Sequence, residues 1–559
     1  MNNYLNKPGA TKYILIFILI VAFVIRVWGS SFGLPYNYHF DEQFYVNTAL
    51  ALGDGVLNNP PYNPTGLSNI LFPQFAAYYL VGKIIGEFSS PQVFEAVFRT
   101  DPTIFYLLAR LTVIVFGAAT ILALFLLGRA SSNSKVGLLA AGFLAVNFLS
   151  VRDSHYSVPD IPMVFFVVLA VGLAANGLRH TRRWNIYLAG LAGGLAVAMK
   201  WTGFPVIAAV MWASVSLEHK VHSGIIGKLV NRTVIVSLLA FVIGFALSSP
   251  QILINPTPYV ELALNLSQVG NGDNLSLTSS AVLNKWLFYG ESLYYGGGII
   301  LIPLGIVGVM RRLKLAVKAR DPMSILLLSF PLFYVIIIIA VTNNRFIRYV
   351  LPLVPFLALF GAEAILVLWT RLRQVRWGRP LVILMVLAAI VLPLTNSIQH
   401  DLILTREDTR TLANEWIEAS IPEGSEIAVD WLVHGPPLSS LEQIVPHSDR
   451  VYDVHVIGGS GLSDQTVAWY KDQGIDYMIA SSFIYMWWTE NLYPERHAFY
   501  NSLGDYFTLV QTFRSHEGDS EPPYIFDEIY GPVISLWQRV RPGPTLKIYR
   551  IQSGGNQAP

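Results

Sequence analysis

Cysteine is absent from the 559 residues of this chain, and charged residues make up only 13% of it. The lack of cysteine excludes a disulfide framework, a thiolate metal site and a cysteine nucleophile. A soluble chain carries about 25% charged residues, whereas this one is 53% hydrophobic with a mean hydropathy of +0.48. The net charge of +2 gives no sign of a nucleic-acid partner. Composition therefore predicts a polytopic membrane protein whose first partner is the lipid bilayer.

Apolar runs long enough to cross a bilayer recur along residues 1–397, which we treat as one membrane domain. About eleven transmembrane helices are expected, near residues 11–29, 102–128, 136–150, 159–178, 185–199, 203–217, 233–249, 295–310, 323–341, 349–370 and 380–397. The short runs 185–199 and 203–217 are expected to be tilted or partly inserted. Lys7 and Lys12 precede the first run and no small-residue cleavage site follows it, which indicates a retained signal anchor.

Lysine and arginine collect in every second connection between these runs, which sets the expected orientation. The basic connections are residues 129–135, 179–183, 218–232, 311–320 and 371–379. Because cytoplasmic loops carry the excess of basic residues, we expect these connections and the N-terminus in the cytoplasm. The first long loop, 31–101, and everything from residue 398 onward then lie outside it. A prokaryotic plasma membrane is the expected setting.

Acidic residues on the predicted external side stand at two places. The stretch YHFDEQFY puts Asp41 and Glu42 among aromatics just after the first apolar run, and VPDIPMVFF puts Asp160 at the start of a later one. Each of these acids could also have a purely structural role. Asp41 and Glu42 could open an amphipathic segment in the membrane interface, and Asp160 could be stabilised by a helix dipole. The chemistry of these acids depends on whether they converge.

Three basic residues lie on the same predicted side, where basic residues should be few. Lys200 ends the run GLAVAMK, and Arg345 and Arg348 flank the turn TNNRFIRY. Snorkelling to the interface would explain any one of them, whereas cations deep in a bilayer usually face a polar cavity or an anion. If the three share a cavity with Asp41 and Asp160, the result is a carboxylate base beside a phosphate cradle. That combination indicates group transfer from a phosphate-bearing lipid.

The order of five short motifs gives a family resemblance over about the first 400 residues. They are DEQFYVNTALALGDG, YLLARLTVIVFGAATILALFLLGR, SHYSVPDIPMVFF, GLAVAMKWTG and RFIRYVLPLVPFLALFGA. In this order they resemble the protein mannosyltransferase and aminoarabinose transferase group, integral membrane glycosyltransferases of the C-type fold that use polyprenyl-phosphate sugars. No single motif is specific, and the sequence of all five carries the likeness.

The resemblance implies a function and a role for each matching residue. Asp41 matches the catalytic base, Glu42 its usual neighbour and Asp160 a second acid of the cavity. The positions expected to hold the donor phosphate are Lys200, Arg345 and Arg348. The implied reaction moves a sugar from a polyprenyl phosphate to a lipid, protein or glycan acceptor on the external side, with inversion. Tyr349, in the same turn motif, is a candidate for the cavity rim, with packing as the alternative, and Arg110 fits a buried structural ion pair equally well.

Hard oxygen and imidazole donors on the external side leave a divalent metal open as a cofactor. They are Asp41, Glu42, Asp160, His39 and His155. None of their spacings is a recognised metal motif, and some enzymes of the resembled group work without a metal. His39 and His155 are therefore expected to be hydrogen-bonding residues at the cavity rim rather than ligands.

From residue 398 to 559 the apolar runs shorten and charges return, which predicts a small external α/β domain. TLANEWIEASIPEGSEIAVD and AWYKDQGIDYMIASS each predict a helix, a turn and a strand, and TLKIYRI predicts a final strand. Two other functions stay open for the chain. A transporter or lipid flippase would also carry intramembrane charges, although no internal repeat is found, and a scaffold without turnover would not need Asp41.

Overall fold

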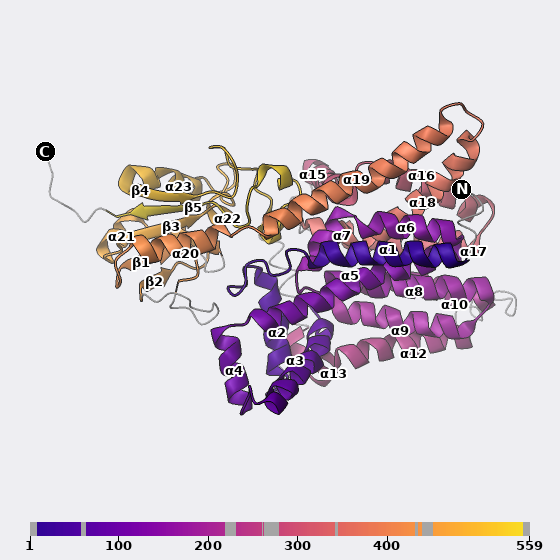
Figure 1. Ribbon diagram of the computed structural model, residues 1–559, viewed down its shortest axis with the longest axis horizontal. Coiled ribbons are helices and arrows are strands. Elements are labelled where there is room, and N and C mark those ends of the chain that lie inside the picture. The colour runs from indigo at the N-terminus through magenta and orange to yellow at the C-terminus, as the bar shows by residue number, and fades with distance from the viewer. Residues whose placement is uncertain are drawn as a thin grey trace. The chain divides into compact units, whose positions relative to one another are not determined.

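The computed structural model describes residues 8–56, 63–218, 231–259, 261, 279–340, 345–430, 434–438 and 451–551. The chain divides into two compact units (Figure 1). Unit 1 comprises Met1–Ser30, Asp41–Gly82 and Leu108–Ile398, and unit 2 comprises Ser31–Phe40, Lys83–Leu107 and Gln399–Pro559. The main change of unit thus falls next to the predicted domain boundary at residue 397, but unit 2 also takes in two pieces of the first external loop.

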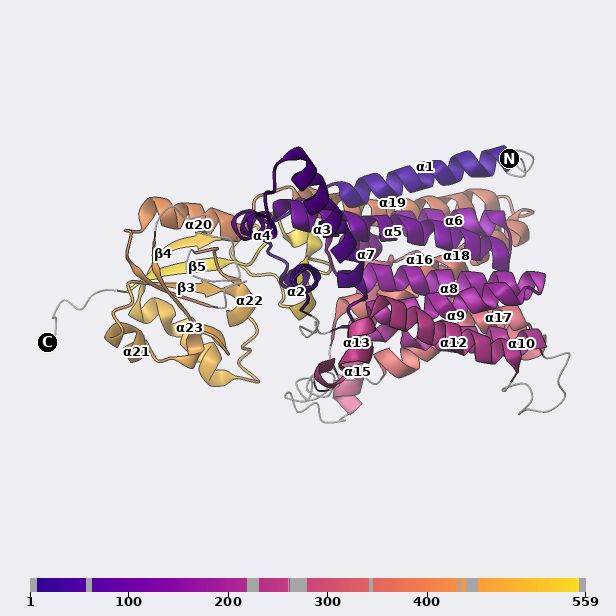
Figure 2. The same ribbon diagram turned by 90° about the horizontal axis from the view of Figure 1, so that it is seen from below.

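Long helices built from the apolar runs make up most of unit 1. They are α1 (Pro8–Val27), α5 (Thr103–Ser131), α6 (Ser134–Ala145), α8 (Asp160–His180), α9 (Arg183–Met199), α10 (Ile207–Glu218), α12 (Arg232–Ser248), α16 (Leu301–Lys318), α17 (Pro322–Tyr334), α18 (Val354–Leu372) and α19 (Gly378–Leu404). Helices α8, α9, α10 and α12 lie side by side (Figure 2). Each predicted span coincides with one of these helices for most of its length.

Shorter elements connect the long helices of unit 1 or extend them. They are α2 (Phe40–Ala51), α3 (Gly66–Ile85), α7 (Phe148–Arg152), α13 (Pro250–Ile254) and α15 (Ser279–Ser292), the 3-10 turns η1 (Asp153–His155), η2 (Trp201–Val206) and η5 (Ile347–Leu353), and the π-helical turns η3 (Leu293–Gly297) and η4 (Val335–Ile339). Residues 31–101, the predicted first external loop, therefore contain α2 and α3, most of whose residues lie in unit 1. Residues 57–62 of that loop are outside the described ranges.

Judged by length and composition, fewer helices are able to cross a membrane than the eleven expected. Within the described ranges, six helices are long and apolar enough to span a bilayer, or up to eight if each of two bent pairs counts as one span. The bent pairs are residues 134–155, which turn by 63°, and residues 284–318, which turn by 110°. A helical membrane protein is thereby confirmed, whereas α9, α10 and α12 are too short to count as spans by themselves.

Small residues let neighbouring helices of unit 1 approach closely. Helix α9 packs against α12, and a methyl group at Gly190 or Gly194 of α9 would overlap the carbonyl oxygens of Ser237 and Phe241 on α12. Such contacts are the usual device for packing helices in a bilayer, because lipid supplies no hydrophobic force between them. The close fit holds α9 against α12, and Lys200, a predicted site residue, directly follows α9.

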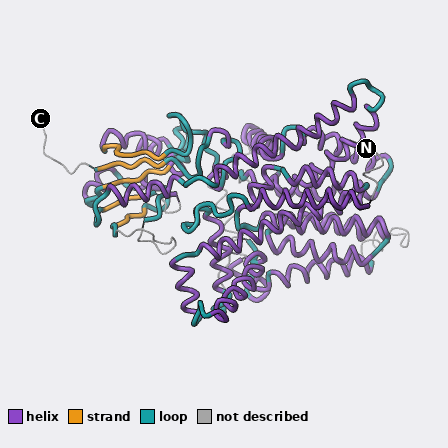
Figure 3. Tube along the Cα trace, in the orientation of Figure 1, coloured by secondary structure: helices purple, strands orange, loops and turns teal. Residues whose placement is uncertain are grey.

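A five-stranded sheet forms the centre of unit 2, and Figure 3 shows its strands in orange. The strands are β1 (Glu426–Val429), β2 (Asp453–Val456), β3 (Tyr477–Ser481), β4 (Thr508–Phe513) and β5 (Leu546–Arg550), in the order β2-β1-β3-β5-β4. Strands β2, β1 and β3 are parallel, and β5 is antiparallel to both β3 and β4. The α/β domain expected from the sequence is confirmed.

Unit 2 also contains helices and short turns. The helices are α4 (Pro91–Thr100), α20 (Thr409–Ser420), α21 (Val467–Asp472), α22 (Ser482–Tyr485) and α23 (Pro494–Tyr506), with short 3-10 turns at Gly461–Asp464, Phe526–Tyr530 and Leu536–Gln538. Helices α20–α23 contribute side chains to the core of the unit. Ala413 and Ile417 of α20 pack with Ile427 and Val429 of β1. The two helix–turn–strand patterns read from the sequence are confirmed by α20 with β1 and by α21 with β3.

A buried carboxylate ties the parallel strands together where β1 ends. Asp430 accepts hydrogen bonds from the backbone N–H groups of Leu462 and Ser481 and from the hydroxyl of Tyr500, each at 2.8 Å. Leu462 follows β2 and Ser481 ends β3. Burial raises the pKa of Asp430 from 3.8 to about 6, although these hydrogen bonds favour its ionised form.

Candidate functional site

One ion pair of unit 1 joins Asp41 to Arg348. Asp41 lies in the first turn of α2, and Arg348 lies in η5, the 3-10 turn that leads into α18. Arg348 Nη1 donates to Asp41 Oδ2 at 2.7 Å, and 12% and 20% of the two side chains remain exposed. The guanidinium carbon also lies 4.8 Å from the ring centre of Phe346. The pair is thus oriented but still reachable by a ligand.

A second ion pair joins Asp160 to Lys200, at the adjacent ends of α8 and α9. Asp160 is the first residue of α8, and Lys200 directly follows α9 with an extended backbone before η2 begins. Lys200 Nζ donates to both carboxylate oxygens of Asp160, at 2.7 Å and 2.9 Å. Both side chains are buried, and Nζ is 5.8 Å from the ring centre of Tyr349. The break between two helices therefore carries a buried, compensated charge pair.

Tyr45 lies beside the first of these pairs. It lies four residues after Asp41, so both side chains share a face of α2. The pKa of its hydroxyl is raised above 10 by burial first, then by the negative charge of Asp41 and, more weakly, of Asp160, while a hydrogen bond from Asn63 opposes the rise. The two ion pairs lie near one another because Lys200 Nζ is 5.8 Å from the ring centre of Tyr349, which follows Arg348 in η5. The helical spacing from Asp41 was the signal that could have identified Tyr45.

Glu42 points away from Asp41 and is enclosed by other partners. Adjacent helical residues project about 100° apart, and Glu42 is fully buried against Arg110. Arg110 Nε and Nη2 donate to its two oxygens at 2.8 Å and 2.7 Å, and Ser157 N donates at 2.6 Å. Arg110 also bonds the carbonyl oxygen of Ser30. The structural ion pair considered for Arg110 is confirmed, and its acid is Glu42.

The two histidines and Tyr349, also predicted site residues, take no part in the two ion pairs described above. His155 is buried and both ring nitrogens face backbone carbonyl oxygens, of Val151 and Trp28, so it does not lie at a cavity rim as expected. His39 is also buried and belongs to unit 2. Tyr349 is half-buried, and its carbonyl oxygen accepts from the hydroxyl of Tyr334.

Arg345 is half-buried and has a basic neighbour that sequence reasoning missed. Lys285 of α15 lies close enough to Arg345 for the two positive charges to repel. Lys285 is itself buried, and its ammonium donates to the carbonyl oxygen of Ala340 at 2.8 Å. A lone lysine in the apolar stretch around residue 285 was the available signal. Together with Lys200 and Arg348, these residues make this end of unit 1 rich in cations.

The donor set considered for a divalent metal does not fit one. Glu42 is enclosed by Arg110 and Ser157, and the ring nitrogens of His155 face backbone carbonyl groups. Asp41 and Asp160 each already hold a cationic side chain. A hard divalent ion takes about six oxygen ligands, and these four residues of unit 1 do not present such a set together. We therefore derive no step through a metal.

The chain is similar to several known proteins. The dolichyl-phosphate-mannose-protein mannosyltransferase family matches residues 78–252. The oligosaccharyltransferase of Archaeoglobus fulgidus in its apo form superposes with a TM-score of 0.52 at 13% identity, covering 88% of this chain and 72% of that one. The same archaeal protein, AglB, in complex with an inhibitory peptide and a dolichol-phosphate gives 0.50 at 14% identity, covering 87% and 72%. No curated protein sequence matches the chain.

A further similar structure is ArnT from Cupriavidus metallidurans bound to undecaprenyl phosphate, with a TM-score of 0.45 at 13% identity over 99% of this chain and 100% of that one. The resemblance read from the motifs to the protein mannosyltransferase group is confirmed by the family match over residues 78–252, and the archaeal structure shows a similar fold. The expected enzyme class, a glycosyltransferase, is the class to which the matched family and the archaeal protein belong.

Proposed function

We propose that unit 1 transfers a sugar from a polyprenyl-phosphate donor to an acceptor on the extracytoplasmic side. The observation that supports this most directly is the pair of contacts Asp41–Arg348 and Asp160–Lys200, which meet at η5, where Tyr349 follows Arg348 and its ring centre is 5.8 Å from Lys200 Nζ. Two carboxylates and two cations in a poorly solvated region provide both a base and a phosphate site. The matched family is named for a dolichyl-phosphate sugar, which has the same donor chemistry.

Donor binding would use the cations at this end of unit 1. Arg348 is the more accessible of the two paired cations, and its planar guanidinium suits two phosphate oxygens at once. Lys200 is fixed by Asp160 and would act on the phosphate as a point charge. Arg345 extends the positive region towards Lys285. As the glycosidic bond breaks, these fixed charges would stabilise the charge that grows on the leaving phosphate.

Binding of the phosphate would also free the base. A carboxylate held by a guanidinium accepts a proton less readily than one without such a partner. When Arg348 bonds the donor phosphate, its 2.7 Å hydrogen bond to Asp41 is lost, and Asp41 can accept a proton. Tyr45, on the same face of α2, would then keep Asp41 directed at the acceptor.

The chemical step is a direct displacement at the anomeric carbon. The acceptor oxygen or nitrogen forms the new bond to that carbon while its proton passes to Asp41. The bond from the carbon to the phosphate oxygen breaks, and its electron pair leaves with the polyprenyl phosphate. Attack from the face opposite the phosphate inverts the anomeric centre. Asp160 contributes by holding Lys200, and Glu42 by fixing α2 through Arg110.

The catalytic site would face the extracytoplasmic side, and its acceptor would be a protein, a lipid or a glycan. The excess of basic residues in alternate connections supports an extracytoplasmic site in a plasma membrane, with the N-terminus in the cytoplasm and unit 2 outside. The archaeal structures include complexes with peptides, so a protein acceptor stands beside lipid and glycan acceptors. A transporter or flippase would need no base, which makes Asp41 the residue that separates the two functions.

The test is sugar transfer by purified protein in lipid, supplied with radiolabelled polyprenyl-phosphate sugars and membrane extract. Wild type is compared with Asp41→Asn, Lys200→Ala and the matched control Asp54→Asn, an exposed acid of the same loop. We expect transfer by wild type and the control, a loss of about a hundredfold or more with Asp41→Asn, and an inverted product. Undiminished transfer by Asp41→Asn would refute the assignment of the base.

A further inference from the structure

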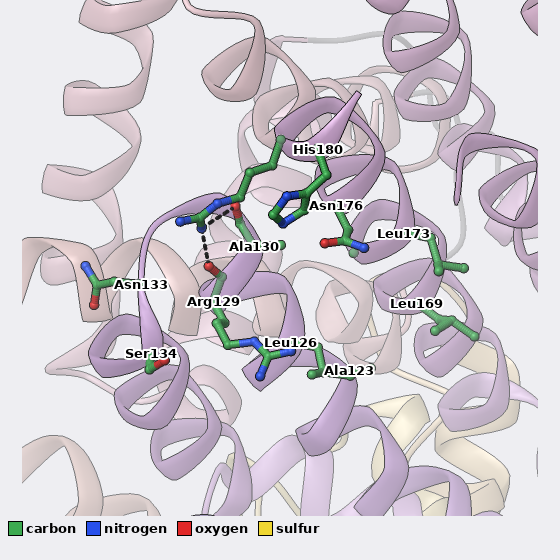
Figure 4. Close-up of a pocket in the computed structure, with 12 residues that line it drawn as sticks. Ala123, Leu126, Arg129, Ala130, Asn133, Ser134, Leu169, Leu173, Asn176 and His180 are labelled. Atoms are coloured by element: carbon green, nitrogen blue, oxygen red, sulfur yellow. Dashed lines mark hydrogen bonds between the residues drawn. The ribbon is translucent and has the colours of Figure 1, made fainter. Parts of the chain in front are cut away.

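A cavity of about 540 Å³ lies at the other end of unit 1, between the C-terminal turns of α5 and α8. Its polar rim comes from Arg129, Asn133 and Ser134 on one side and from Asn176 and His180 on the other (Figure 4). Arg179 also lines the cavity. Helix α8 runs from Asp160 to His180, so at 1.5 Å per residue the rim is about 30 Å from the Asp160–Lys200 pair. The cavity is thus separate from the proposed catalytic site by roughly one bilayer core.

The charge of this cavity is positive. Arg129 and Arg179 supply two guanidinium groups, His180 adds an imidazole, and no carboxylate is among the residues that line it. Arg179 is anchored, because its Nη1 donates to the carbonyl oxygens of Arg129 and Ala130 at 2.6 Å and 3.0 Å. These carbonyl groups are at the negative end of α5, which offsets the charge of Arg179. Arg129, which is exposed, remains as the cationic group at the rim, beside the exposed imidazole of His180.

Below the rim the cavity becomes apolar. Ala123 and Leu126 line it from α5, and Leu169, Gly172 and Leu173 line it from α8, at the three- and four-residue spacing of a single helix face. Figure 4 shows Leu173 and Leu169 following Asn176 along α8, away from His180. A polar, cationic head above an apolar groove is complementary to a lipid with an anionic headgroup, and not to a free anion alone.

We propose that this cavity binds one anionic phospholipid of the cytoplasmic leaflet. The headgroup phosphate bonds Arg129 and His180, the amide of Asn176 donates to a headgroup oxygen, and an acyl chain follows Leu126, Leu169 and Leu173. The basic connections 129–135 and 179–183 place this end of unit 1 on the expected cytoplasmic side. Basic pockets between transmembrane helices on that side are typical sites for anionic headgroups.

The experiment is native mass spectrometry of the full chain in detergent, titrated separately with phosphatidylglycerol, phosphatidylcholine and glycerol phosphate. Variants are Arg129→Gln, which removes the accessible charge, and Leu173→Trp, which fills the groove without changing charge. Lys318→Gln is the matched control, because Lys318 is an exposed cation in another connection on the same expected side. All variants are first checked for the wild-type melting temperature and a single size-exclusion peak.

Wild type and Lys318→Gln should bind one phosphatidylglycerol in preference to phosphatidylcholine, with little affinity for glycerol phosphate. Arg129→Gln should weaken that binding about fivefold, the effect of one basic group near an anionic lipid, and Leu173→Trp should weaken it at unchanged charge. Equal binding of the two lipids, equal binding of glycerol phosphate, or full binding by Leu173→Trp would each overturn the proposal. An effect of Lys318→Gln as large as that of Arg129→Gln would overturn it too, since attraction would then be general to the basic surface.

Discussion

Replacing Glu42 by glutamine changes one atom in the most completely buried ion pair of α2. Glu42 and Arg110 are both 0% exposed, and three donor groups converge on the carboxylate at 2.6–2.8 Å. Glutamine keeps an oxygen for Arg110 Nε and Ser157 N, but its amide group then faces Arg110 Nη2, donor against donor. The guanidinium also loses its counter-charge.

The size of the effect follows from this geometry. A buried charge left without its partner costs about 3–5 kcal/mol, and a donor left without an acceptor costs about 1–3 kcal/mol. These overlap, because they concern the same guanidinium, so we expect Glu42→Gln to lower the unfolding free energy by about 3 kcal/mol. The double variant Glu42→Gln/Arg110→Met removes the charge as well as its partner and should recover most of that loss.

The measurement is unfolding by sodium dodecyl sulfate in mixed micelles, followed by tryptophan fluorescence, together with the sugar-transfer assay on the same samples. Glu42→Gln should lose stability and transfer in proportion, since Glu42 acts by fixing α2 and hence Asp41. Asp41→Asn, whose side chain is 20% exposed, should keep its stability and lose transfer. If Glu42→Gln were as stable as wild type but as inactive as Asp41→Asn, Glu42 would be a reacting acid and our reasoning would be wrong.

Three further predictions concern the other buried groups. Burial raises the pKa of Asp430 from 3.8 to about 6. The contribution of this group to the unfolding free energy of unit 2 is therefore fully present below pH 4, and about 3 kcal/mol of it should be lost as the pH rises through 6. Unfolding free energies across this range test it, and a profile that Asp430→Asn leaves unchanged would contradict the assignment. Gly461 has φ +74°, and a methyl group there would lie 2.5 Å from Asp430 Oδ1 and 2.7 Å from the Tyr500 hydroxyl. Gly461→Ala should therefore lower the melting temperature, with a cost of about 1–2 kcal/mol from the backbone alone, and an unshifted melting curve would speak against it. Lys200→Met leaves Asp160 buried without a counter-charge and should cost about 3–5 kcal/mol. Adding Asp160→Asn should restore stability but not sugar transfer, and a fully active double variant would remove Lys200 from the donor site.

Segments whose pattern is local were predictable from the sequence. Each apolar run became a helix because its backbone must satisfy its own hydrogen bonds in lipid, and the alternation of helix, turn and strand in TLANEWIEASIPEGSEIAVD reappears as α20 and β1. The number of membrane crossings was harder to predict from the sequence. Length and hydropathy decide whether a helix spans a bilayer, and α9, at 17 residues, falls short of that length.

The sequence by itself determined which parts are present: a helical membrane domain, a small α/β domain, and the acidic and basic residues available for catalysis and binding. Only the tertiary structure decided how they pair. Asp41 meets Arg348 across 307 residues of chain, while its neighbour Glu42 turns to Arg110. Such pairing depends on which helix ends the packing brings together. No periodicity within a helix encodes that choice, because charge attraction acts through space and not along the chain.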